Sequence, residues 1–238
     1  MVDFDALLDR VLTAVDAQAF VTPIAGIDDP EEVRLVEPFF AGLGAPEPDI
    51  EGLRALVREL RGTGSITERR AVILLQTLAA HPAVEDLREL GRLIGEEEHL
   101  VLATGGPRMT ARLAVVDHHR AVHAFLLGRY EVALELETRS AAARPWGDSL
   151  ANILILLLRL DQEGRARALL RQIRRRFPLD LVRQVERYIH QDPDLALLRD
   201  QLAIPVEVRE APGGVGPDPA NSTPIAPEDD DPCDPVLH

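Results

Sequence analysis

The chain has 238 residues, 46% of them hydrophobic and only 4% aromatic, and its 40 acidic and 26 basic residues give a formal net charge of −14. This length allows one or two domains with a hydrophobic core. The negative charge repels nucleic acid and anionic membranes, so we expect neither as a partner.

The remaining bulk features predict a cytoplasmic protein. All basic residues are Arg, and the single cysteine, Cys233, cannot form an internal disulfide, so nothing requires an oxidising compartment. The N-terminus is acidic and lacks the basic region of a signal peptide. The longest apolar run, residues 153–158, is too short to span a membrane.

Apolar residues recur with helical spacing through the first half of the chain. In chain order, this pattern predicts helices over residues 4–15, 30–40, 49–62 and 66–81, and another that aligns Leu87, Leu90 and Ile94. Ser65 and Glu68 have the spacing of a capping box. The sequence Ala103–Pro107 is the clearest internal break, so we expect residues 1–105 to form an irregular helical domain.

The second half continues as helices, with no alternating β pattern of useful length. The predicted helices lie near residues 108–127, 129–143, 148–160, 163–177, 179–191 and 194–203. Residues 108–203 are therefore a second helical domain in this prediction. Residues 204–238 are rich in Pro, Gly and Asp and predict a disordered acidic tail. The expected fold class is all-α.

Two segments of the second half match at an offset of 33 residues. Residues 128–145 align with 161–178, which places Ala133 on Ala166 and Pro145 on Pro178. Gly128 falls on Asp161 at the turn between two helices. Glu137 falls on Leu170, where a repeat should bury an apolar residue.

This pattern resembles the tetratricopeptide repeat, a helix-turn-helix unit of about 34 residues. The resemblance covers about two repeats, roughly residues 114–178, and implies a short right-handed array of helical hairpins. In that family the first helix of each repeat lines a concave groove. The resemblance thereby implies these partner-binding residues: His118, His119, Val122, Phe125, Asn152, Ile155 and Arg159. Asn152 would bind a peptide backbone, or merely a neighbouring backbone group, and Arg159 would pair with an acidic group.

A second surface hypothesis concerns one side of the helix at 163–177. Arg167, Arg171, Arg174 and Arg175 form a stripe there. The stripe is either a solvated helix face or a docking surface for an acidic partner or the acidic tail.

Catalytic interpretations are weaker. The string Asp117-His118-His119 resembles the signature of DHH phosphoesterases, but the upstream Asp motifs and the parallel sheet of that family are missing from the sequence. His119 and His123 have the spacing of two metal ligands on one helix face, without an identifiable third. We therefore expect no enzyme activity, no metal and no cofactor, and a metal-dependent hydrolase is the least favoured alternative.

The sequence best predicts a non-catalytic adaptor or scaffold that binds a peptide or partner protein through a helical-repeat groove. The alternative is a chaperone-like or accessory subunit of a larger bacterial assembly. A homo-oligomer and a subunit of a complex both stay open at this point.

Overall fold

The computed structural model describes residues 30–106 and 109–203, and every regular element within those ranges is a helix. The predicted all-α class is therefore confirmed for this part of the chain. The predicted helix at 4–15 and the predicted tail at 204–238 lie outside the described residues. The helices are α2 Pro30–Leu43, α3 Ile50–Gly62, α4 Glu68–Ala80, α5 Leu87–Thr104, α6 Met109–Leu126, α7 Tyr130–Ala143, α8 Gly147–Arg159, α9 Glu163–Arg176, α10 Leu179–Gln191, the 3₁₀ helix η1 Pro193–Leu198 and α11 Arg199–Leu202.

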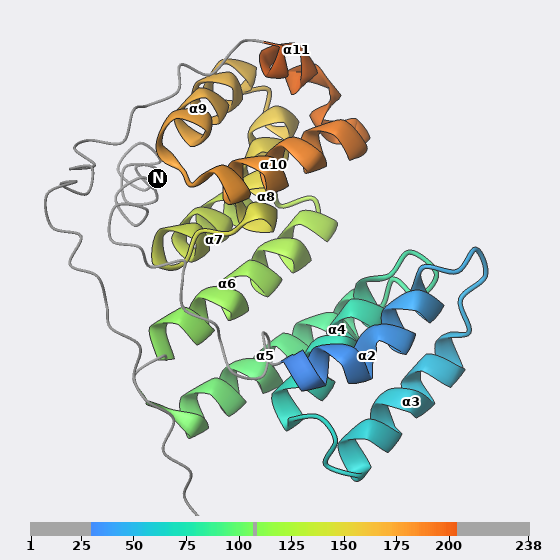
Figure 1. Cartoon of the computed structure of the whole chain (residues 1–238). Coiled ribbons are helices and arrows are strands. Elements are labelled where there is room, and N and C mark those ends of the chain that lie inside the picture. Colours follow the sequence, from blue (N-terminus) through green and yellow to red (C-terminus); the bar gives the residue numbers. More distant parts are fainter. Residues whose placement is uncertain (1–29, 107–108, 204–238) are drawn as a thin grey trace, which may run out of the picture. The chain divides into compact units, whose positions relative to one another are not determined.

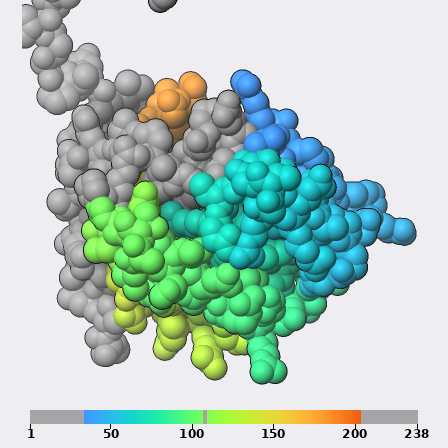
Figure 2. All heavy atoms as spheres, turned by 90° about the horizontal axis from the view of Figure 1, so that it is seen from below, coloured from blue at the N-terminus to red at the C-terminus, as the bar shows by residue number. Residues whose placement is uncertain are grey.

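Most helices pack against their neighbours in sequence, so α6 lies between α5 and α7 (Figure 1). In addition, α8 packs against both α10 and η1. Figure 2 shows the face on which the segment from α3 to α5, coloured cyan to green, forms one continuous surface.

Three groups of buried apolar side chains follow one another along the chain. The first joins α2, α3 and α4, and the second joins α4, α5 and α6 through residues such as Val72 and Val116. The largest runs from α6 to η1 and includes Ile153, Leu154 and Leu157 of α8. Because the second group joins α4 and α5 to Val116 of α6, side chains contact one another across the predicted boundary at residues 105–108. The division into two domains there stays a prediction.

The two hairpins α6–α7 and α8–α9 have equivalent turns. Gly128 and Asp161, 33 residues apart, both adopt positive φ, 71° and 57°. The hydrogen bonds match as well: the N–H of Gly128 bonds the carbonyl of Phe125, and the N–H of Asp161 bonds that of Leu158, at 2.8 and 3.0 Å. The sequence match at the turn therefore reflects shared local geometry. The tetratricopeptide resemblance itself stays a hypothesis.

Two local predictions were wrong. The N-cap of α4 is Thr67, whose hydroxyl accepts from the N–H of Arg70 at 3.2 Å. Glu68 pairs with Arg61 instead of closing a capping box with Ser65. The predicted helix at 194–203 is instead η1 followed by the short α11. Leu195 and Leu198 are both fully buried there, and their spacing of three suits the three-residue turn of a 3₁₀ helix.

Within residues 30–106 and 109–203, no helix combines the length and the apolar character needed to cross a membrane.

Candidate functional site

Two pockets are lined by α6 and share the side chain of Val122. The α6–α8 pocket has a volume of about 290 Å³ and is lined by Ala121, Val122, Phe125, Leu126, Glu137, Asn152, Ile155, Leu156, Asp192 and Asp194. The α4–α6 pocket has a volume of about 300 Å³ and is lined by Leu43, Ile73, Gln76, Thr77, Ala80, His81, Leu90, His118, His119 and Val122. Both have the size of small ligand sites, with mostly apolar walls and few polar groups.

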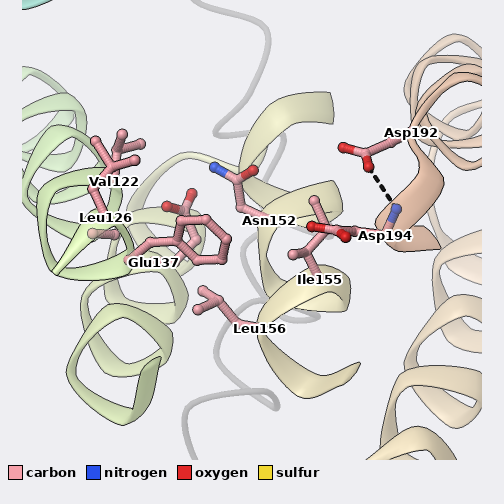
Figure 3. A pocket seen from close by; sticks show the side chains of 10 residues that line it. Val122, Leu126, Glu137, Asn152, Ile155, Leu156, Asp192 and Asp194 are labelled. Carbon is pink, nitrogen blue, oxygen red and sulfur yellow. Dashed lines mark hydrogen bonds between the residues drawn. The ribbon is translucent and has the colours of Figure 1, made fainter. Parts of the chain in front are cut away.

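The α6–α8 pocket has apolar side chains from α6 and α8 along its walls and two aspartates at its far end. Figure 3 shows Val122 and Leu126 of α6 facing Asn152 and Ile155 of α8 across it. At the far end, a carboxylate oxygen of Asp192 accepts from the N–H of Asp194 at 2.8 Å and so caps η1 (Figure 3).

A fully buried carboxylate, Glu137 of α7, separates this pocket from His118. The Nδ1 of His118 lies 2.9 and 3.1 Å from the two carboxylate oxygens of Glu137. The side-chain amide of Asn152 is turned toward this carboxylate and favours its charged form. On its other side the His118 ring meets Trp146 edge-on, with centroids 5.2 Å apart. Glu137 thus joins the two pockets through one hydrogen-bonded pair.

A second fully buried carboxylate, Glu97 of α5, accepts hydrogen bonds from three side chains. Arg69 donates to its Oε1 from Nη2 at 2.9 Å and from Nε at 3.1 Å. Gln76 and His119 donate to its Oε2, at 3.0 and 2.6 Å. The cluster joins α4, α5 and α6. Two of its buried atoms, Arg69 Nη1 and Gln76 Oε1, have no hydrogen-bond partner among the described residues.

These contacts shift the acidities of the buried groups. Burial would favour the neutral form of Glu97, but the charges and hydrogen bonds of His119, Arg69 and Gln76 outweigh it and lower the pKa of Glu97 to about 2. Burial alone would lower the pKa of His118, but the adjacent Glu137 carboxylate raises it above its usual value. Burial raises the pKa of Glu137 itself. Both shifts favour a proton held by the His118–Glu137 pair.

The low pKa of Glu97 predicts a specific loss of stability in acid. Its carboxylate contributes stability above its ordinary pKa of 4.5, and this contribution disappears as the pH falls through about 2. The difference corresponds to about 3 kcal/mol of unfolding free energy. Urea denaturation of the wild type and Glu97→Gln between about pH 6 and about pH 3 measures the first part of this loss, about 2 kcal/mol. The loss should be smaller in the variant; an equal loss in both proteins would contradict the assignment to Glu97.

The structure brings six of the seven predicted partner-binding residues to these two pockets. His118 and His119 line the α4–α6 pocket, and Phe125, Asn152 and Ile155 line the α6–α8 pocket. Val122 lines both. Figure 3 shows the amide nitrogen of Asn152 turned toward the Glu137 side chain, and its predicted role in binding a peptide or a backbone group stays a prediction.

The seventh residue, Arg159, is not among the residues that line either pocket. Its Nη2 lies 2.6 Å from a carboxylate oxygen of Asp194, so an acidic group of this chain already pairs with it. Its predicted role as a partner for an external acidic group stays untested.

The residues of the Asp-His-His string point to three different partners. Asp117 accepts two hydrogen bonds from Arg139, each of 2.7 Å, while His118 and His119 bind Glu137 and Glu97. The ring of His123 lies against Gly91 of α5. Within the described ranges, no group of three or more His, Cys, Asp or Glu side chains is arranged to hold a metal ion.

The predicted arginine stripe on α9 contacts α10 and α11. Arg167 donates to Asp200 at 2.7 Å, and Arg174 donates to Glu186 at 3.0 Å and to the carbonyl of Gln201 at 2.7 Å. Arg171 reaches the Gln201 side chain at 3.4 Å, and Arg175 is exposed. The stripe thereby holds α11 against α9. Docking of the tail or of a partner there stays a prediction.

Comparison of the chain with protein-family models, with curated proteins and with solved structures finds no match. The site must therefore be interpreted from its own geometry.

Proposed function

We propose that the protein is a non-catalytic adaptor that binds a peptide segment of a partner protein along α6 and α8. One observation carries the proposal: the first helices of two equivalent hairpins, α6 and α8, line the same apolar pocket. Stacked helical hairpins build concave binding surfaces from equivalent helices in this way.

The lining suits an extended peptide. Val122, Phe125 and Ile155 offer apolar contact for a side chain, and Asn152 offers an amide beside them. An amide can both donate to and accept from a peptide backbone. A cytoplasmic location and a protein partner fit the acidic composition and the single cysteine.

Site-specific photo-crosslinking tests this proposal. A photoreactive amino acid placed at Phe125 should capture one protein in cells of the native host, whereas the same residue at Leu179, which is 62% exposed on α10, should not capture it. The captured partner is then titrated against Ile155→Ser and, as the matched control, Leu179→Ser. We expect Ile155→Ser to weaken binding by about tenfold or more, because a polar group would replace an apolar wall of the pocket.

Two outcomes would contradict the proposal: the same partner captured equally from both positions, or equal affinities of the two serine variants. If binding instead collapses when Arg171 and Arg175 are changed to Glu, the arginine stripe is the docking surface.

A further inference from the structure

The α4–α6 pocket has a chemistry that peptide binding does not use. Three histidines line it: His81 at the C-terminal end of α4, and His118 and His119 on α6. Among the described residues, no carboxylate belongs to its lining. The other walls are mostly apolar and come from Leu43, Ile73, Ala80, Leu90 and Val122. We propose that this pocket is a binding site for a small carboxylic acid with an apolar chain.

The hydrogen bonds of the three imidazoles leave one nitrogen of each for a ligand. His118 and His119 use Nδ1 to bind Glu137 and Glu97, which leaves Nε2 on the opposite edge of each ring. His81 accepts from the N–H of Ala83 through Nδ1 at 3.2 Å, so its neutral ring carries the hydrogen on Nε2 and can donate it. When these rings are protonated, each Nε2 carries a hydrogen and can donate it to a carboxylate, which accepts hydrogen bonds and carries one negative charge.

The charges around the pocket determine how the site responds to pH. Arg69 of α4 and Glu97 of α5 form an ion pair, and the Glu137 carboxylate of α7 lies against His118. Asp148 of α8 adds a negative charge near His118, but it also accepts a hydrogen bond from Tyr188 at 2.5 Å. A carboxylate bound beside the three imidazoles adds a negative charge that favours their protonated forms, so binding should be accompanied by proton uptake.

The volume limits the apolar part of the ligand. At about 300 Å³ the pocket lies at the lower end of the range for small-molecule sites. It is roughly twice the size of an engineered apolar cavity that holds benzene, about 150 Å³. A chain of about six carbons fits this space, so hexanoate is the probe and hexanamide is its neutral counterpart of nearly the same shape.

Isothermal titration of the full chain with both probes is the decisive experiment. Hexanoate should bind about tenfold or more tightly than hexanamide near pH 6, and its affinity should fall about tenfold or more between about pH 6 and about pH 8. Titrations in two buffers of different ionisation enthalpy should show uptake of about one proton per hexanoate bound. Hexanamide should show neither effect.

Matched histidine variants locate the site. His119→Gln keeps a donor for Glu97 but cannot take up a proton, so it should reduce both hexanoate affinity and proton uptake, and the double variant with His81→Gln should reduce both further. His99→Gln, at an exposed histidine of α5, is the control and should leave both unchanged. Fluorescence of Trp146, the chain's only tryptophan, should respond to hexanoate because its ring touches His118.

Three results would overturn the proposal. Equal binding of hexanoate and hexanamide would mean that the pocket recognises the apolar chain that the two probes share rather than a charge. Binding without proton uptake would contradict the charge argument. Failure of hexanoate to bind, while a peptide with a free C-terminal carboxylate binds and its amidated form does not, would assign the pocket to a protein terminus. None of these results depends on whether the α6–α8 pocket binds a partner.

Discussion

Replacing Glu97 with Ala should lower the free energy of unfolding by about 3–5 kcal/mol, the cost typical of removing one member of a buried ion pair. Arg69 would keep its positive charge in the interior without the carboxylate that its Nε and Nη2 now contact. Gln76 and His119 would lose the acceptor that they share. The loss therefore falls on three helices at once, α4, α5 and α6.

Glu96→Ala on the same helix is the matched control. Glu96 pairs with Arg92 at 2.9 Å, but Arg92 is exposed and the Glu96 side chain is 32% exposed, so removing it should cost about 1 kcal/mol or less. Urea denaturation followed by circular dichroism measures both variants. Similar losses in the two proteins would mean that the Glu97 cluster is not the polar core that joins these helices.

The buried acids show what the sequence could and could not reveal. Spacing predicted the helices well, because apolar residues on one face are what packing requires. In α5 the stripe through Leu90, Ile94 and Val101 also includes position 97, where a Glu stands. A charge at a core position is a signal for a buried pair, but the three consecutive glutamates at 96–98 resemble an ordinary solvated surface.

Glu137 is the opposite case. The 33-residue offset placed it on Leu170, so an apolar residue was expected, and both side chains are in fact fully buried. The partner could not be predicted, because contact with His118 depends on how α6 packs against α7 rather than on spacing along one helix. Likewise, nothing in the sequence brings His81 to His118 and His119; that approach depends on the packing of α4 and α6 around one pocket. For the same reason the pairing of Arg159 with Asp194 was not foreseen.

The second large effect concerns the His118–Glu137 pair, which should be replaceable as a pair but not one residue at a time. His118→Leu leaves the fully buried Glu137 without its main partner, so we expect a loss of about 3 kcal/mol. Glu137→Met removes the acceptor of His118, and the unpaired donor should cost about 1–3 kcal/mol.

The double variant His118→Leu/Glu137→Met should recover most of this loss, because an apolar pair of similar size needs no desolvated charge. A coupling energy of about 2 kcal/mol or more from denaturation of all four proteins would show the direct interaction, whereas strictly additive losses would show that the two side chains do not interact in the folded protein.

If the double variant is as stable as the wild type, stability does not explain why a charged pair lies between two pockets. The same double variant should then bind hexanoate about tenfold or more weakly, since it lacks the proton and the imidazole that face the α4–α6 pocket. Stability retained together with binding lost would mean that the pair serves recognition rather than folding.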